Sequence, residues 1–287
     1  MPYLYIAGAV VFAACVASYI GSMRWLKIKH EKFYTDKNLS LKILLISDFH
    51  SNSLKRTNER IWENIHALDF DLAAITGDLL QSRLGELEPI KQHLRRLSER
   101  VPVFYVEGNH EKFIYTEVYR ELEKIGVKGL ENRRVRLKVP GGELDVVGVA
   151  DYNRLKRERF LPVRRAFSGR NGEIYTLLLS HQPSIINKIE KYRPDLMLCG
   201  HTHGGQVRFP FLPALYAPTQ GLLPRYDHGR YRVGETDIFV SKGVGATFFH
   251  IRFFNRPEVA VIEVCKKMMS PGVPYGCILG ENEWKAK

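Results

Sequence analysis

The chain has 287 residues, of which 45% are hydrophobic and 26% charged, values that exclude a disordered or fibrous protein. This length allows one large α/β domain with a sizeable core. Its net charge of +12 favours an anionic partner such as nucleic acid, anionic lipid or a phosphorylated small molecule, or a basic surface near a membrane. Two of its four cysteines, Cys15 and Cys199, lie in apolar segments, so we expect no structural disulfides.

The first predicted element is an apolar N-terminal helix. Residues 3–23 carry no charged side chain, and 21 residues are enough to span hydrocarbon. Basic residues follow at once, so the positive-inside rule places the remainder of the chain on the cytoplasmic face. We therefore expect residues 1–32 to be a transmembrane anchor with a basic flank, in a single-pass protein of the cell membrane. The alternatives are a buried core helix, or an exported domain on an uncleaved signal anchor.

After a polar linker at residues 33–40, strands and helices alternate. Apolar residues at helical spacing predict four helices: 58–68, 88–100, 114–125 and 183–191. Strands interleaved with such helices are typical of βαβ units. Further strands follow without long helices, which predicts a second, more antiparallel sheet packed on the first: 133–139, 144–149, 236–240 and 259–264.

Three segments complete the predicted organisation. Residues 154–170 are strongly basic and are expected to form an exposed helix or loop. Residues 209–224 are unusually apolar for a loop. They form either an apolar rim that admits an acyl chain or inserts into the bilayer, or a proline-rich loop folded onto its own domain. We expect the globular domain to cover residues 41–265, with a C-terminal tail at 266–287.

Five apolar, strand-like runs each stop at residues with metal-binding side chains. The five endings are Asp48-Phe49-His50, Gly77-Asp78, Gly108-Asn109-His110, His181 and Gly200-His201-Thr202-His203. Polar side chains are costly at the end of a buried strand unless they have partners. In α/β folds the carboxyl ends of neighbouring strands face one crevice, where carboxylate, amide and imidazole groups together indicate a metal site. Asp151 follows another strand and could lie near this site, but is more typical of a turn.

In their order, these motifs resemble the signature of calcineurin-like metallophosphoesterases, and the resemblance covers roughly Leu41 to Val264. The motifs His203-Gly204-Gly205-Gln206 and Asn255-Arg256-Pro257-Glu258 are similar to a membrane-associated bacterial branch of that superfamily. The resemblance implies a four-layered αββα sandwich of two mixed sheets flanked by helices. It also implies two metal ions at the strand ends.

The resemblance assigns a role to each signature residue. One metal ion would be held by Asp48, His50, Asp78 and His203. The other would be held by Asp78, Asn109, His181 and His201, with Asp78 as the bridge. His110 would stand beside the substrate phosphate as the general acid that protonates the leaving group. Ligands without thiolate suit Mn, Fe or Zn, and paired ions can supply hydroxide near neutral pH.

We therefore expect a membrane-anchored, di-metal phosphoesterase that cleaves a phosphodiester or pyrophosphate bond with metal-activated hydroxide. The anchor and the apolar loop favour a lipid-linked substrate, and some members of the resembled branch act on UDP-2,3-diacylglucosamine in lipid metabolism. One alternative is a nuclease or nucleotide phosphodiesterase, although the chain has no aromatic-rich nucleic-acid module. The other is a non-catalytic membrane scaffold, which predicts eroded ligands, and none is eroded. The native metal pair and the oligomeric state stay open.

Overall fold

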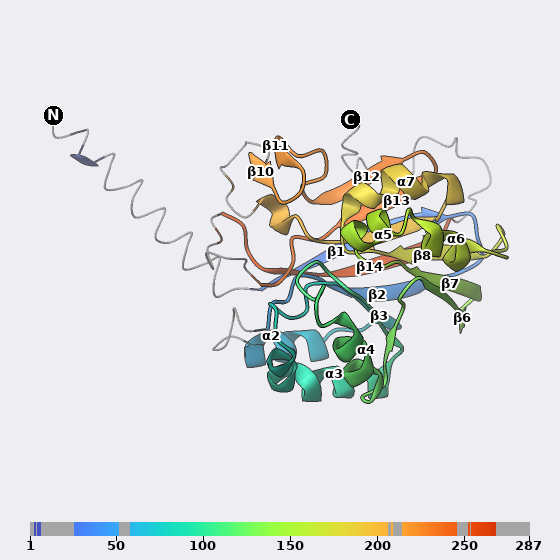
Figure 1. The fold of residues 1–287 in the computed structure, drawn as a ribbon, viewed down its shortest axis with the longest axis horizontal. Helices are drawn as coiled ribbons and strands as arrows, with labels where there is room; N and C mark the ends of the chain where they lie inside the picture. Colours follow the sequence, from blue (N-terminus) through green and yellow to red (C-terminus); the bar gives the residue numbers. More distant parts are fainter. Residues whose placement is uncertain are drawn as a thin grey trace.

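Two six-stranded sheets form the centre of this computed structural model (Figure 1). The structure describes residues 26–51, 58–205, 208, 214–245, 252 and 254–267, together with Tyr3, Tyr5 and Ile6. Both sheets are mixed, and helices cover their outer faces, which confirms the predicted mixed α/β fold with two mixed sheets.

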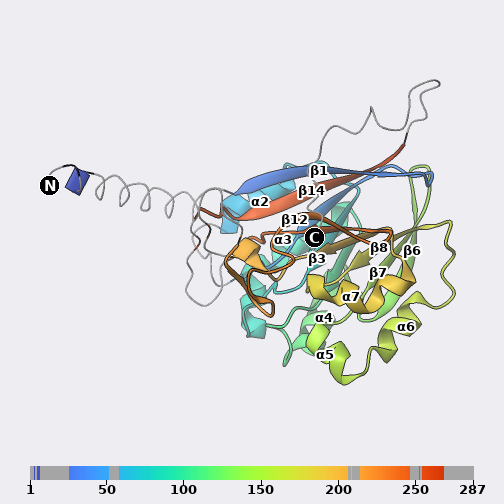
Figure 2. The same cartoon turned by 90° about the horizontal axis from the view of Figure 1, so that it is seen from above.

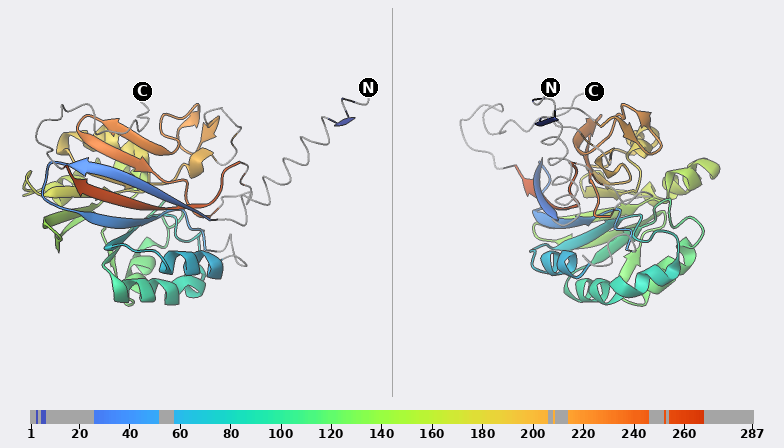
Figure 3. Two further views of the ribbon diagram at one scale, coloured as in Figure 1. Left: turned by 180° about the vertical axis from the view of Figure 1, so that it is seen from behind. Right: turned by 90° about the vertical axis from the view of Figure 1, so that its left-hand side faces the viewer.

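The first sheet is mainly parallel. Its strand order is β1 (Lys27–Thr35), β14 (Glu258–Lys266), β2 (Leu41–Ile46), β3 (Leu72–Thr76), β4 (Val103–Val106) and β5 (Val127–Gly129). Only the β14–β2 pairing is antiparallel among these described strands, and Figure 3 shows β14 lying between β1 and β2. Strands β3 and β4 are buried on both faces, as their uninterrupted apolar sequences require.

The second sheet has a parallel centre and antiparallel edges. Its strand order is β12 (Gly229–Val233), β13 (Thr236–Val240), β9 (Leu196–Cys199), β8 (Tyr175–Leu179), β7 (Gly142–Gly148) and β6 (Arg133–Val139). The β12–β13 and β6–β7 pairings are antiparallel, so this sheet has more antiparallel pairing than the first. A separate two-stranded hairpin is formed by β10 (Tyr216–Ala217) and β11 (Gly221–Leu222).

Helices and sheets form layers around three apolar clusters. The outer face of the first sheet is covered by α2 (Asn58–His66), α3 (Glu88–Arg100) and α4 (Tyr115–Glu123). The outer face of the second is covered by α5 (Tyr152–Arg157), α6 (Leu161–Phe167) and α7 (Ile186–Ile189). Between the sheets, Ile43 and Phe104 of the first belong to the same buried cluster as Leu177 and Phe239 of the second. Short 3-10 turns complete the chain: η1 (Leu84–Leu87), η2 (Pro183–Ile185), η3 (Glu190–Tyr192) and η4 (His203–Gly205).

The predicted membrane anchor is not supported. Among the described residues, no helix is long and apolar enough to cross a membrane. The longest of them, α3, has 13 residues and one buried face, whereas a span needs about 20 apolar residues. Most of the predicted anchor, residues 7–25, lies outside the described residues. As far as the chain is described, the predicted single-pass localisation is therefore wrong.

Residues 27–35, expected to be part basic flank and part linker, instead form β1. This strand pairs in parallel with β14 along one edge of the first sheet (Figure 2). Phe33 and Thr35 are buried while Lys32 and Tyr34 are exposed, so β1 has one buried face and one exposed face. The charged residues on the exposed face explain why the sequence predicted a flank and a linker instead of a strand. The domain limits stay a prediction, and residues 209–213 and 268–287 lie outside the described residues.

Candidate metal centre

The five polar strand endings come together at one place, although they belong to two sheets. β2, β3 and β4 of the first sheet lead into Asp48, Asp78 and Asn109. β8 and β9 of the second lead into His181 and His201. The sequence predicted convergence at one crevice, and the structure builds it where the ends of the two sheets meet. Fixed strand ends place these side chains more rigidly than loops alone would.

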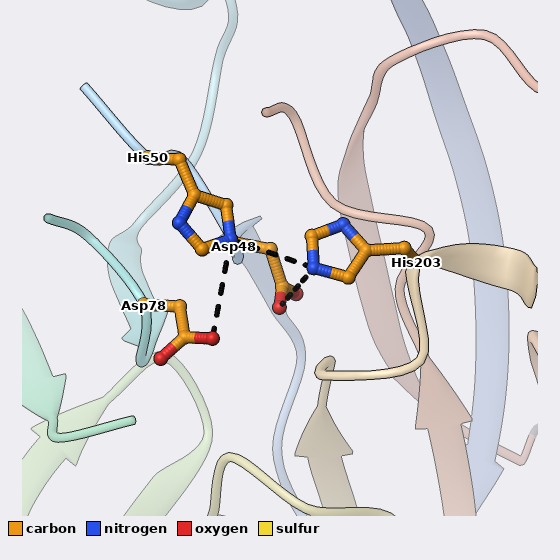
Figure 4. Close-up of side chains that lie close together, drawn as sticks. All are labelled: Asp48, His50, Asp78 and His203. Atoms are coloured by element: carbon orange, nitrogen blue, oxygen red, sulfur yellow. Dashed lines mark hydrogen bonds and ion pairs between the residues drawn. The ribbon is translucent and has the colours of Figure 1, made fainter. Parts of the chain in front are cut away.

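The first ligand set consists of Asp48, His50, Asp78 and His203, whose donor atoms lie within 4.8 Å of one another (Figure 4). The Nε2 atoms of His50 and His203 are 3.4 Å apart, and His203 Nε2 is 3.4 Å from Asp48 Oδ1. Burial lowers the pKa of His50 to about 3 and that of His203 well below its usual range. Both rings are therefore neutral, and their nitrogens face a common point beside two carboxylates. A cation fits that point, since imidazole lone pairs and carboxylates both coordinate it.

The second ligand set shares Asp78 with the first. Its donor atoms from Asp78, His181 and His201 also lie within 4.8 Å of one another. His181 Nε2 is 3.1 Å from Asp78 Oδ2, 3.1 Å from Asn109 Oδ1 and 3.0 Å from His201 Nδ1. All seven side chains predicted as metal ligands are thus brought together, and Asp78 lies where the two sets meet.

The charge balance explains why these groups need a cation. Burial raises the pKa of Asp48 to about 6, although His181 opposes the shift. Burial also disfavours a charged His181, but the Asp78 carboxylate outweighs it and raises the pKa of His181 to about 10. Without metal, a proton on His181 is therefore the nearest compensation for the buried carboxylates. The buried Asp and His side chains suit a di-metal site, and leave the identity of the metal open.

Buried hydrogen bonds hold the acidic ligands in place. Ser47 Oγ donates to Asp48 Oδ2 at 2.6 Å, and the backbone N–H of His201 donates to both Asp48 oxygens at 3.0 Å. The buried Glu111 carboxylate accepts the N–H groups of Asp78 at 3.1 Å and Gly108 at 2.9 Å. Glu111 therefore ties the loop after β3 to the loop after β4. No role was predicted for Glu111, and its position directly after His110 was the available signal.

Two of the four ligand histidines have an oxygen partner at the ring nitrogen that faces away from the ligand sets. His181 Nδ1 lies 2.9 Å from the Thr76 carbonyl oxygen. His201 Nε2 lies 3.1 Å from Thr219 Oγ1. An accepting oxygen of this kind fixes the ring orientation of a metal ligand. His203 Nδ1 instead lies 3.4 Å from Arg252 Nη2, and a guanidinium can only donate. Neither Thr219 nor Arg252 was predicted, because both come from distant segments with no recognisable spacing.

Many of the predicted ligands have an unusual backbone. Five of them lie in the left-handed region, with φ values of 49° for Asp48, 45° for His50, 49° for Asp78, 69° for His201 and 49° for His203. Residues other than glycine adopt this region at a cost, and such strain gathers at functional sites. The neighbouring glycines leave no room for a side chain. A Cβ on Gly200 would lie 1.8 Å from Ser47 Oγ, and a Cβ on Gly108 would lie 2.1 Å from Asp78 Oδ1.

His110 lies at the edge of the centre. Its side chain is 27% exposed, unlike the buried histidines of the two sets, and its Nε2 is 3.9 Å from Asp78 Oδ2. Its Nδ1 lies 2.8 Å from the Gln81 carbonyl oxygen, which orients the ring. Asp151 caps α5 by accepting from Asn153 N at 2.9 Å and also accepts from Gln182 Nε2 at 2.8 Å. Asp151 is thus both a turn residue and a support for the loop that carries His181.

The chain is similar to a known protein family and to several known proteins. The family model for calcineurin-like phosphoesterases matches residues 41–205. A Helicobacter pylori protein named uncharacterized metallophosphoesterase is 34% identical over 248 residues, covering 84% of this chain and 64% of the relative. The chain thus spans less than two thirds of that relative's length. Phosphodiesterase YaeI of Escherichia coli is 29% identical, covering 83% of this chain and 87% of the relative.

Among solved structures, phosphopantetheinyl hydrolase (PptH) from Mycobacterium tuberculosis is similar with a TM-score of 0.47 and 14% identity. The match covers 72% of this chain and 89% of that one. A likeness of this degree carries no argument about chemistry.

Proposed function

The chain belongs to the calcineurin-like phosphoesterase family, and we propose that it hydrolyses a phosphodiester or pyrophosphate bond with two divalent metal ions. The observation that carries this proposal is the pair of ligand sets that meet at Asp78. Two ions bound there would supply Lewis-acid activation of water and neutralise charge on the phosphoryl oxygens. One set would comprise Asp48, His50, Asp78 and His203, and the other Asp78, Asn109, His181 and His201.

The residues around the ions have separate tasks in this proposal. Asp78 serves both ligand sets, so its carboxylate offsets repulsion between the two cations. The backbone N–H of His201 holds the Asp48 carboxylate, and Glu111 holds the backbone of Asp78. Both contacts preserve the geometry that a phosphoryl group must meet. The buried imidazoles of His50 and His201 are neutral and add no positive charge of their own.

His110 is proposed as the general acid. Its Nδ1 lies against the Gln81 carbonyl oxygen, which leaves Nε2 facing the centre at 3.9 Å from Asp78. A protonated His110 would use both N–H groups, one to hold the ring and one to protonate the leaving oxygen. Its partial exposure fits a group that meets substrate rather than metal.

We also propose that the substrate carries an apolar group, as a lipid-linked phosphate such as UDP-2,3-diacylglucosamine does. The β10–β11 hairpin supports this substrate class. Its Leu222 is 80% exposed and its Tyr216 57%, and the hairpin turn contacts His201 through Thr219. Exposed apolar side chains beside a phosphate-binding centre suit an amphiphilic substrate.

The test is hydrolysis by the purified full chain loaded with Mn²⁺, Fe²⁺ or Zn²⁺. Bis(p-nitrophenyl) phosphate, p-nitrophenyl phosphate, a diacylated nucleotide sugar and single-stranded DNA form the panel. We expect the diester to be cleaved faster than the monoester, and the diacylated substrate to be cleaved best. Protein that binds two metal ions and cleaves none of these would overturn the activity, and preference for DNA would favour a nuclease.

A further inference from the structure

The turn of the β10–β11 hairpin contacts a ligand of the second set. His201 directs Nδ1 towards that set, 3.0 Å from His181 Nε2. Its other nitrogen, Nε2, therefore points away from the ligands and lies 3.1 Å from Thr219 Oγ1. His201 is only 4% exposed, although Thr219 lies on an exposed turn.

The chemistry of imidazole gives this contact a direction. A neutral ring carries one N–H, and a nitrogen that binds metal must offer a lone pair instead. With Nδ1 turned to the metal, the hydrogen lies on Nε2, and the Thr219 hydroxyl oxygen accepts it. A partner of this kind fixes both the tautomer and the ring orientation of a ligating histidine.

The hairpin holds Thr219 in an otherwise unfavourable conformation. Thr219 has φ 60°, which is costly for a β-branched residue. On one side the hairpin is closed by Leu223 N donating to the Leu215 carbonyl oxygen at 2.9 Å. On the other, Gln220 exchanges two hydrogen bonds with the backbone of Tyr226, at 2.7 and 3.0 Å. These contacts keep the hydroxyl beside His201 in spite of the strain.

We propose that Thr219 is a positioning residue that holds Nδ1 of His201 towards the second metal and so makes the β10–β11 hairpin part of the metal centre. The inference rests on the proposed function only in requiring a metal ion at the second ligand set. It involves no substrate, so it can be tested by metal binding alone.

The test is calorimetric titration of the metal-free chain with Mn²⁺ or Zn²⁺, for wild type, Thr219→Val and Thr219→Ser. Valine keeps the branched shape but has no acceptor, whereas serine keeps the hydroxyl. We expect Thr219→Val to weaken binding of the second metal roughly tenfold, with the first unchanged. Thr219→Ser should restore wild-type affinity. Equal affinity in Thr219→Val and wild type, or a Thr219→Ser protein as weak as Thr219→Val, overturns the proposal.

Hydrogen exchange supplies a second readout. Metal binding should slow amide exchange at residues 216–222 in the wild type, because linkage between hairpin and metal is reciprocal. That protection should disappear in Thr219→Val and persist in Leu222→Ser, which leaves the hydroxyl in place. Protection unchanged in Thr219→Val would overturn the link between hairpin and metal. A wild type with no second metal would overturn the proposed function as well, so the two failures are distinguishable.

Discussion

The two ligand sets share Asp78 yet differ in how the protein surrounds them. In the first set, Asp48, His50 and His203 are at most 1% exposed, and His203 lies beside the fully buried Arg252. In the second, Asn109 is half-buried, and His201 contacts a hairpin whose Tyr216 and Leu222 are exposed. The first set is therefore enclosed by buried side chains, whereas the second borders side chains that face solvent.

Replacing the shared carboxylate should have the largest effect, because it removes a ligand from both sets. Asp78→Asn keeps the shape of the side chain but loses its charge. We expect turnover to fall at least about a thousandfold, with metal lost from both sets. Metal content per chain and kcat/KM measure this, with circular dichroism as the control for folding. If the first metal stayed bound, the two sets would not depend on Asp78 equally.

His110→Ala should separate chemistry from metal binding. Removing a general acid typically costs on the order of 10²–10⁴ in rate, so kcat should fall by about that factor. Metal content should match wild type, since His110 lies outside both sets. The loss should be smaller for a substrate with a p-nitrophenolate leaving group, which needs little protonation. A His110→Ala protein without metal would show that this residue is a ligand.

Metal affinity should depend on pH differently for the two sets. The pKa of His181 is raised to about 10, so a metal that binds the second set must displace its proton. Between pH 7 and 9 affinity there should rise by about tenfold per pH unit. In the first set His50 has a pKa of about 3 and Asp48 of about 6, so both are already deprotonated above pH 7. Calorimetry at several pH values checks this, and parallel slopes for both metals would contradict the comparison.

Arg252 should affect stability and the first set only. Its guanidinium donates to the Gly245 and Lys242 carbonyl oxygens, at distances down to 2.5 Å, in a site with no exposure. Arg252→Met leaves those acceptors unpaired, so we expect a loss of about 1–3 kcal/mol in the free energy of unfolding. Chemical denaturation of the metal-free chain measures this loss. If Arg252→Met weakened binding of the second metal alone, the assignment of Arg252 to the first ligand set would be contradicted.

The sequence predicted more of the centre than of its surroundings. Asp48, Asn109 and His201 could be found because each follows a buried strand, and buried strands have a recognisable apolar pattern. β1 was missed because an edge strand with one exposed face carries charges, which read as a linker. Thr219 and Arg252 were missed because their contacts depend on where distant loops return in space, and no local pattern records that.

The left-handed backbone of five ligands has an evolutionary consequence. Glycine would relieve strain of about 1–3 kcal/mol at each of these positions. A lineage that no longer used the metals would therefore gain stability with each ligand it lost to glycine. Aspartate and histidine at all five positions in this chain indicate that selection has favoured chemistry over stability, which argues against descent into a non-catalytic scaffold.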